Sequence, residues 1–190
     1  MNLELGPRLK DARLKFGLSL RAVAREIGVS PSLLSQVENS KTSPSVATLY
    51  RLVTTYGVTM DSLLNESPLT DVPKATSGPL GNNVQRAQDA PSVKMSKGVL
   101  WERMADSAGG GVDPLLATYQ PGSSSSDDYS LTGHSGLEYG VIIEGELNLT
   151  IGEQTTKLQV GDSFSFDSTL PHSYSNTTAQ VARGVWFILN

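Results

Sequence analysis

The hydrophobic pattern changes its period partway along the chain, and this change constrains the fold more than any other feature. In residues 1–66, apolar side chains such as Leu5 and Leu9 recur every three to four positions, which is typical of amphipathic helices. From Val93 onward, short runs such as residues 146–151 alternate apolar and polar side chains, which is typical of strands. The chain is therefore predicted to be an α+β protein, with a helical domain followed by an antiparallel β domain.

Five short helices are predicted in the first part of the chain. Apolar side chains group at helical spacing in four segments, and a fifth turn is predicted to end near Leu64. Ser19 and Ser30 come just before the second and third segments, and Ser43 or Ser45 comes before the fourth. A serine hydroxyl at such a position can cap the N-terminus of a helix. The first part is therefore expected to form a compact five-helix bundle.

The middle of the chain separates the two patterns. Residues 67–92 lose the periodicity and gain proline, glycine and polar residues, which is typical of a linker. The β domain is expected to cover residues 93–190. Strand-like runs within it are predicted at residues 99–104, 115–119, 139–143, 146–151, 156–158, 163–166 and 181–189. Many short strands at even spacing favour an antiparallel barrel or jelly roll.

Two kinds of connection are predicted between these strands. Gly145 and Gly152 fall where hairpin turns are expected. Residues 123–126 are four consecutive serines followed by two aspartates. Such a run predicts a polar, mobile loop.

Composition and charge exclude several functional classes. The chain has no cysteine, so disulfides, cysteine-ligated zinc and a thiol nucleophile are excluded. Residues 1–58 carry a net charge of +4, whereas the whole chain carries −4, so the remainder carries −8. A basic head suits binding to phosphates, and a solvated surface explains it equally well. Because no apolar run suggests a membrane span or a signal peptide, we expect a cytoplasmic protein that does not contact a membrane.

Residues 20–39, LRAVAREIGVSPSLLSQVEN, have the spacing of two helices joined by a short turn. Ala24 is small enough for a close helix crossing, and Gly28 can take the left-handed conformation that ends the first of these helices. Leu34 and Val37 are expected to face the core one helical turn apart. This arrangement is typical of a helix-turn-helix.

The resemblance to a known family becomes specific at this point. Residues 5–64, including SLLSQVENSKTSPSVATLYRL, resemble the helix-turn-helix domain of phage repressors and their bacterial relatives, the XRE type. The resemblance implies that residues 30–38 form a helix that enters the major groove of a double-stranded DNA operator. Base and phosphate contacts are thereby expected from Arg21, Ser30, Pro31, Ser32, Ser35, Gln36, Asn39 and Lys41. The alternative is a helical bundle that binds another protein.

Within this set, Gln36 is the best base reader, because an amide can pair bidentately with adenine. The predicted recognition helix has no Arg or Lys, so specificity is expected to rest partly on DNA shape. Arg21, Asn39 and Lys41 are placed for phosphate contacts. Glu38 is expected to be a structural cap or ion-pair partner.

Two further motifs lie far apart in the β domain. The first reads TGHSGLE at residues 132–138, and the second comprises GDSFSF and LPHSYSN between residues 161 and 176. They resemble the two motifs of the cupin family, and the resemblance covers residues 93–190. In that family, two histidines spaced by one residue, a glutamate and a distant histidine bind one divalent metal.

The resemblance leaves three candidate metal ligands, His134, Glu138 and His172, because Thr132 stands at the first histidine position. The two histidines are the only ones in the chain. Two imidazoles and one carboxylate with open positions suit zinc or iron(II). No organic cofactor is expected. In the alternative interpretation, the histidines bind no metal and hydrogen-bond an effector directly.

A small-molecule effector is expected to bind beside these ligands. Thr132 is one candidate pocket residue, and Tyr174 and Asn176 alternate with His172 along one predicted strand. Four aromatic residues either wall this pocket or simply fill the barrel core: Tyr119, Tyr139, Phe166 and Trp186.

Two functions fit these motifs. In the first, the chain is a transcription regulator, and the effector shifts the geometry of a homodimer whose heads contact half-sites one DNA turn apart. In the second, it is a mononuclear non-haem iron enzyme, because an epoxidase of fosfomycin biosynthesis has the same domain order and a similar ligand segment. The well-formed recognition motif favours the regulator, since an enzyme would not need it.

Overall fold

The computed structural model describes residues 5–58, 63, 84–105, 112–127 and 131–189. Within this part of the chain, the N-terminal region holds four α-helices, which are α1 (Leu5–Lys15), α2 (Leu20–Glu26), α3 (Pro31–Glu38) and α4 (Val46–Tyr56). The fifth helical turn predicted near Leu64 lies outside the described residues, apart from Leu63, which is buried. The helical class of this region is as predicted.

Local capping explains where these helices begin. Ser19, Ser30 and Ser45 precede α2, α3 and α4, and each hydroxyl accepts a hydrogen bond from a backbone N–H in the first turn. These bonds satisfy donors that have no partner inside the helix. Gly28 lies in the turn between α2 and α3 with φ +73°, a conformation that favours glycine. The predicted caps and the turn glycine are confirmed.

The helical domain packs around a small apolar core. Leu9, Ala24, Leu34, Leu49 and Leu52 are each at most 1% exposed. Ala24 is completely buried, in agreement with its predicted place at a close helix crossing. Burying each such leucine contributes roughly 2 kcal/mol of hydrophobic free energy.

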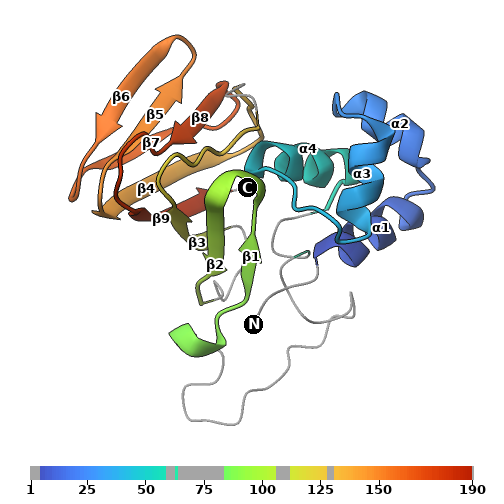
Figure 1. Ribbon diagram of the computed structural model, residues 1–190, viewed down its shortest axis with the longest axis horizontal. Coiled ribbons are helices and arrows are strands. Elements are labelled where there is room, and N and C mark those ends of the chain that lie inside the picture. The colour runs from blue at the N-terminus through green and yellow to red at the C-terminus, as the bar shows by residue number, and fades with distance from the viewer. Residues whose placement is uncertain (1–4, 59–62, 64–83, 106–111, 128–130, 190) are drawn as a thin grey trace.

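The β domain consists of two antiparallel sheets. The larger has the strand order β1-β2-β3-β9-β4-β7, and the smaller has the order β6-β5-β8. Figure 1 shows the smaller sheet lying alongside the larger one, as in a flattened barrel. The strands are β1 (Ser92–Lys94), β2 (Val99–Arg103), β3 (Val112–Tyr119), β4 (Leu137–Glu144), β5 (Leu147–Ile151), β6 (Gln154–Leu158), β7 (Ser163–Asp167), β8 (His172–Ser175) and β9 (Ala182–Leu189).

The strand prediction holds in most places. All seven predicted runs fall on strands, and Gly145 and Gly152 adopt positive φ in the turns on either side of β5. Gly152 lies in the β5–β6 hairpin, as predicted. The hairpin expected at Gly145 was wrong, because β4 and β5 belong to different sheets and do not pair. The short strand β1 was not predicted. Of the expected linker at residues 67–92, only residues 84–92 are described, and they hold a single 3-10 turn (Ala87–Asp89) before β1 begins.

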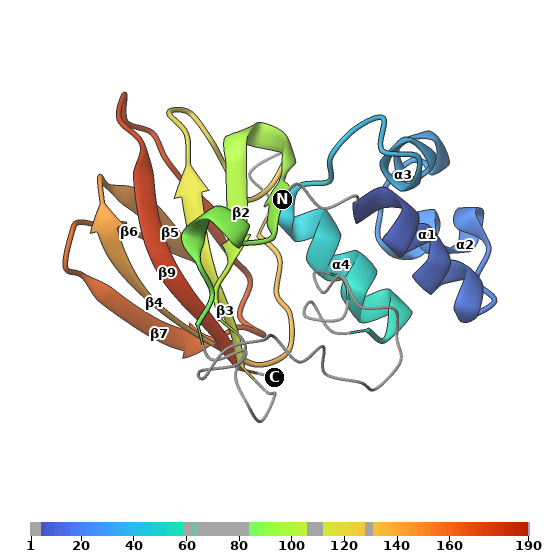
Figure 2. The ribbon, with the colours of Figure 1, turned by 90° about the horizontal axis from the view of Figure 1, so that it is seen from below.

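Helix α4 lies between the barrel and the other three helices in both views of the fold (Figures 1 and 2). Eight of its eleven residues are buried. A helix that is buried on nearly every side must pack against two bodies. Leu49 and Leu52 belong to the helical core, whereas Val46, Ala47 and Tyr50 line a cavity in the barrel.

The polar loop predicted at residues 123–126 is buried instead. All four serines are at most 6% exposed. Ser125 donates its backbone N–H to the carbonyl of Tyr174 at 2.9 Å, and its own carbonyl accepts from the N–H of Ala47 in α4 at 3.0 Å. The prediction was wrong because strand-like pairing with β8 satisfies the backbone while the barrel and α4 cover the segment.

None of the described helices is both long and apolar enough to cross a membrane.

Candidate functional site

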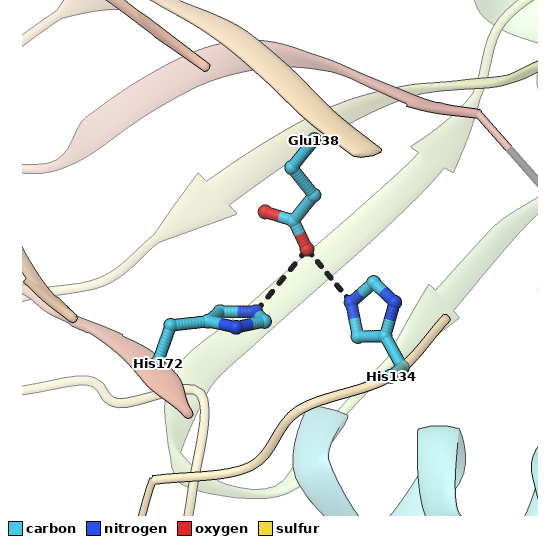
Figure 3. Close-up of side chains that lie close together, drawn as sticks. All are labelled: His134, Glu138 and His172. Carbon is cyan, nitrogen blue, oxygen red and sulfur yellow. Dashed lines mark hydrogen bonds and ion pairs between the residues drawn. The ribbon is translucent and has the colours of Figure 1, made fainter. Parts of the chain in front are cut away.

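Three side chains from separate parts of the β domain converge inside the barrel: His134, Glu138 and His172 (Figure 3). Glu138 is the second residue of β4, and its side chain points inward because alternate residues of that strand are buried. His172 opens β8. His134 lies before β4, where its N–H donates to the carbonyl of Ser168 at 2.8 Å. All three are at most 8% exposed.

The backbone fixes the orientation of both imidazoles. The Nδ1 atom of His134 lies 3.0 Å from the carbonyl oxygen of Ser135, and that of His172 lies 2.8 Å from the carbonyl oxygen of Leu170. Because a carbonyl can only accept, each Nδ1 carries the proton. Each Nε2 atom is thereby turned toward the Glu138 carboxylate.

The Nε2 atoms meet one oxygen of that carboxylate. Oε1 of Glu138 lies 2.8 Å from Nε2 of His134 and 3.2 Å from Nε2 of His172. Two lone pairs directed at an anionic oxygen repel it unless a positive charge lies between them. A proton or a divalent cation can supply that charge.

The surroundings keep Glu138 ionised. Burial opposes its ionisation, but hydrogen bonds from His134, His172 and Tyr174, together with the charge of His172, lower the pKa of Glu138 to about 2. For His172, burial lowers the pKa, and the hydrogen bond and charge of Glu138 outweigh this and raise it. The hydroxyl of Tyr174 donates to Oε2 of Glu138 at 2.6 Å. The site thus holds a buried carboxylate that favours a cation beside it.

These residues fit a divalent metal by their donor set. Two imidazole nitrogens and a carboxylate oxygen lie within 4.8 Å of one another. Ligating histidines usually donate their second ring N–H to a carbonyl or carboxylate, as both do here. Thr132 stands where the family has a further histidine, and its hydroxyl accepts from Nη2 of Arg51 at 3.0 Å.

A cavity of about 30 Å³ adjoins the three ligands. Thr132 and Tyr174 line it, as expected of effector-pocket residues, and Tyr119 and Trp186 also line it. Its other lining residues were not expected: Val46, Ala47, Tyr50, Trp101, Leu115, Ala117, Ser125 and Ile188. The sequence signal that could have revealed the α4 residues is the scarcity of charged side chains on that helix, which has Arg51 alone.

The expected pocket residue Asn176 and two of the candidate aromatic residues, Tyr139 and Phe166, lie elsewhere. Asn176 does not line the cavity: its amide donates to the carbonyls of Tyr119 and Gln180, and its side-chain oxygen accepts from Thr178. Tyr139 is 45% exposed on the outer face of the larger sheet. Phe166 is outside the cavity and packs edge-on against the His172 ring at 4.9 Å. The predicted alternation along β8 fails at Asn176 because the strand ends at Ser175.

The predicted DNA-contacting residues lie on and around α3. Arg21, Pro31, Ser32, Gln36 and Lys41 are exposed. The Ser30 hydroxyl caps α3, and the Asn39 amide donates to the Ser35 carbonyl at 2.7 Å. In Figure 2, α2 and α3 lie on the side of α4 away from the barrel, so this face is open to solvent.

Glu38, at the end of α3, faces the interior instead. It is 2% exposed and pairs with Arg13 at 2.6 Å. The expectation that Glu38 is an ion-pair partner is confirmed.

Comparison with known families agrees with both motifs. Residues 9–63 match the helix-turn-helix family, and residues 115–188 match the cupin domain family. The fold and these two matches define a transcriptional regulator with a helix-turn-helix head and a cupin body.

Whole-chain relatives identify the family further. The HTH-type transcriptional regulator PuuR of Escherichia coli (strain K12) is 32% identical over 182 residues, which cover 94% of this chain and 90% of PuuR. The HTH-type transcriptional regulator SutR of the same organism is 25% identical over 173 residues, covering 90% of this chain and 86% of SutR. The chain therefore belongs to the family of helix-turn-helix transcriptional regulators that includes PuuR.

Two solved structures share the fold. A helix-turn-helix transcriptional regulator from Vibrio cholerae superposes with a TM-score of 0.67 at 22% identity, covering 98% of this chain and 95% of that one. Hydroxypropylphosphonic acid epoxidase from S. wedmorenis gives a TM-score of 0.50 at 19% identity, covering 98% and 97%. Because the whole-chain relatives are named regulators, the chain is a regulator rather than an enzyme, and the likeness to the epoxidase is one of fold.

Proposed function

We propose that this protein is a cytoplasmic, homodimeric regulator that binds a DNA operator through α3 and senses a small molecule at a divalent metal held by His134, Glu138 and His172. The observation that carries the sensor part is the orientation of the two imidazoles. Both Nδ1 atoms are fixed on backbone carbonyls, so both Nε2 atoms face one ionised carboxylate. Zinc and iron(II) are the candidate metals.

The metal would act as a Lewis acid that accepts a donor atom from the effector. Three protein ligands leave coordination positions open. Around them, this chain supplies a carboxylate oriented by Tyr174 and walls that are largely apolar and aromatic. No organic cofactor is part of the proposal.

Metal content is the direct test of the site. The full-length protein is reconstituted with Zn²⁺, or with Fe²⁺ without oxygen, and bound metal per chain is measured after dialysis. We expect one equivalent in the wild type, none in His134→Ala or His172→Ala, and one in the control Glu153→Ala, which changes an exposed residue in the β5–β6 turn. A reconstituted wild type without metal would contradict the proposal.

The DNA-binding part rests on the exposed face of α3. Gln36 and Ser32 point outward, and Arg21 and Lys41 flank them, which is the placement that base reading and phosphate contact require. Selection from a random DNA pool with the full-length protein should recover a two-fold symmetric sequence. Recovery of unrelated sequences would contradict specific binding.

The homodimer part is supported by an apolar patch on the larger sheet. Tyr139 of β4 and Phe187 of β9 are register partners and are 45% and 39% exposed, and Leu137 beside them is 43% exposed. We propose that a second copy of the chain covers this patch, because two half-sites require a symmetric dimer.

Sedimentation should show a dimer that Tyr139→Lys weakens and Val160→Lys does not. Val160 is the matched control, since it is 62% exposed in the β6–β7 turn. Equal sedimentation of all three proteins would place the interface elsewhere.

A further inference from the structure

Helix α4 of the DNA-binding domain covers the cavity at the candidate metal site. The phenol ring of Tyr50 lies parallel to the His134 imidazole, with centroids 3.9 Å apart and planes 6° from parallel. The same ring meets Trp101 edge-on at 5.7 Å. With Val46 and Ala47, Tyr50 forms what we call the roof of the cavity.

Backbone and side-chain hydrogen bonds hold the roof in place. The N–H of Ala47 donates to the carbonyl of Ser125 at 3.0 Å, and the N–H of Ser96 donates to the carbonyl of Pro44, just before α4, at 2.9 Å. Both contacts join the N-terminal end of α4 to the barrel. The helix is therefore attached to the barrel through groups that would otherwise need other partners.

Arg51 extends this connection to the DNA-binding motif. Its Nη2 atom donates to the hydroxyl of Thr132 at 3.0 Å, and its Nη1 atom donates to the carbonyl of Ile27 at 3.3 Å. Ile27 caps the C-terminus of α2, in the turn that leads to α3. One side chain thus connects the metal-site segment with the turn before the recognition helix.

The cavity beneath the roof is small. Its volume is about 30 Å³, whereas pockets that bury most of a drug-sized ligand measure roughly 300–1,000 Å³. The space is therefore small for a bulky organic effector beside a metal ion. A ligand of several non-hydrogen atoms can reach the metal site only if the roof moves.

We propose that the effector-binding site is composite, with Val46, Ala47 and Tyr50 of the DNA-binding domain as part of its wall, and that effector binding displaces Tyr50 and with it α4. This rests on the proposed function, since it needs a ligand at His134, Glu138 and His172. The expected ligand is a small organic molecule with one donor atom for the metal and a body that would contact the roof.

Occupation of the site and docking of α4 then exclude each other. A ligand that binds only the arrangement with α4 displaced shifts the protein toward that arrangement. A change that raises the equilibrium constant for displacement of α4 therefore raises the affinity for the ligand by the same factor. Release of α4 also breaks the Arg51 connection to the turn before α3. The orientation of the two DNA-reading heads would change as a result.

Full-length protein loaded with Co²⁺ tests this proposal, with imidazole as the probe ligand. The visible spectrum of Co²⁺ reports imidazole binding at the metal. We expect Tyr50→Ala to bind imidazole at least tenfold more tightly than the wild type, because no stacked ring has to leave. Tyr50→Phe keeps the ring and should bind it like the wild type.

Spin labels measure displacement of α4 in the same proteins. The chain has no cysteine, so Lys10→Cys in α1 and Glu153→Cys in the β5–β6 turn introduce one exposed label site in each domain. We expect a narrow distance distribution in the wild type and in Tyr50→Phe. It should become longer and broader in Tyr50→Ala, and in the Co²⁺-loaded wild type saturated with imidazole.

Each measurement can overturn one part of the proposal. Equal imidazole affinity in wild type and Tyr50→Ala would overturn the composite site, and tighter binding without any change in distance would overturn the displacement of α4. If Co²⁺ does not bind at all, the proposed metal site fails instead. The spin labels then still test the roof, which is overturned if Tyr50→Ala leaves the distance distribution narrow and unchanged.

Discussion

The guanidinium of Arg13 in α1 and the carboxylate of Glu38 at the end of α3 form a two-point ion pair inside the helical domain. The two hydrogen bonds measure 2.6 and 2.8 Å, and Nη1 of Arg13 also donates to the carbonyl of Leu18 at 2.9 Å. The side chains are 9% and 1% exposed. The hydrogen bond from Arg13 to Glu38 is the main reason that the pKa of Arg13 is raised.

Breaking this pair should destabilise the protein strongly. Glu38→Gln leaves the Arg13 charge buried without its counter-charge, and such a loss costs about 3–5 kcal/mol. We expect the free energy of unfolding, measured by urea titration, to fall by that amount. Glu26→Gln, an exposed change in α2, should alter it by less than about 0.5 kcal/mol. If Glu38→Gln lowered the free energy of unfolding no more than the control does, the ion pair would contribute little to stability.

The tight crossing of α1 over the end of α3 predicts a second effect on stability. A methyl group added at Gly6 would collide with the carbonyl oxygen of Val37 and lie 2.9 Å from the backbone nitrogen of Ser40. Because backbone atoms cannot yield as a flexible side chain can, Gly6→Ala should cost about 1–3 kcal/mol. Lys10→Ala, an exposed change in the same helix, should be nearly neutral. Chemical unfolding of both variants checks this, and a stabilised Gly6→Ala would contradict the close approach.

The features that sequence could predict are those set by neighbouring residues. Ser19, Ser30 and Ser45 cap helices whose first turn follows them directly, so the hydroxyl and its partner lie within three residues. Gly28 is needed by a turn whose conformation is local. The metal-site motifs are also short runs, and their resemblance to a family supplied the long-range pairing that the residues alone did not.

The features that sequence could not predict depend on distant partners. Tyr50 looks like one more apolar residue in α4, and only the fold brings it onto His134, far along the chain. The serines at 123–126 look exposed, but β8 and α4 cover them. Asn176 has the correct period for the pocket, yet the end of β8 turns its amide to the backbone instead.

Tyr174 is predicted to orient the metal-binding carboxylate. Its hydroxyl donates to Oε2 of Glu138 at 2.6 Å and leaves Oε1 toward the two histidines. Tyr174→Phe removes this bond and keeps the ring, and loss of such an outer partner typically lowers metal affinity 10–100-fold. We expect unchanged stoichiometry with at least tenfold weaker Zn²⁺ binding in a chelator competition assay. Tyr139→Phe is the control, because Tyr139 lies on the outer face of the barrel. Equal affinity in the two variants would mean that Tyr174 only fills space.

Gln36 and Lys41 should affect DNA binding in different ways. If Gln36 reads a base, Gln36→Ala should weaken binding to the selected operator by about 1–3 kcal/mol and relax the base preference at one position of each half-site. If Lys41 contacts a phosphate, Lys41→Ala should weaken binding to every sequence alike and reduce the slope of log affinity against log salt by about 1. Both side chains are exposed, so neither change should alter the fold.

Binding titrations on the selected operator and on variants with single base changes, each at several salt concentrations, separate these two roles. Glu26→Ala on the exposed surface of α2 is a control for general changes in surface charge. If Gln36→Ala lowered affinity uniformly across all sequences, base reading would have to come from the remaining outward residues of α3, chiefly Ser32, or from the shape of the DNA. In that case the recognition helix, which has no Arg or Lys, would position the protein on the duplex without reading the bases through Gln36.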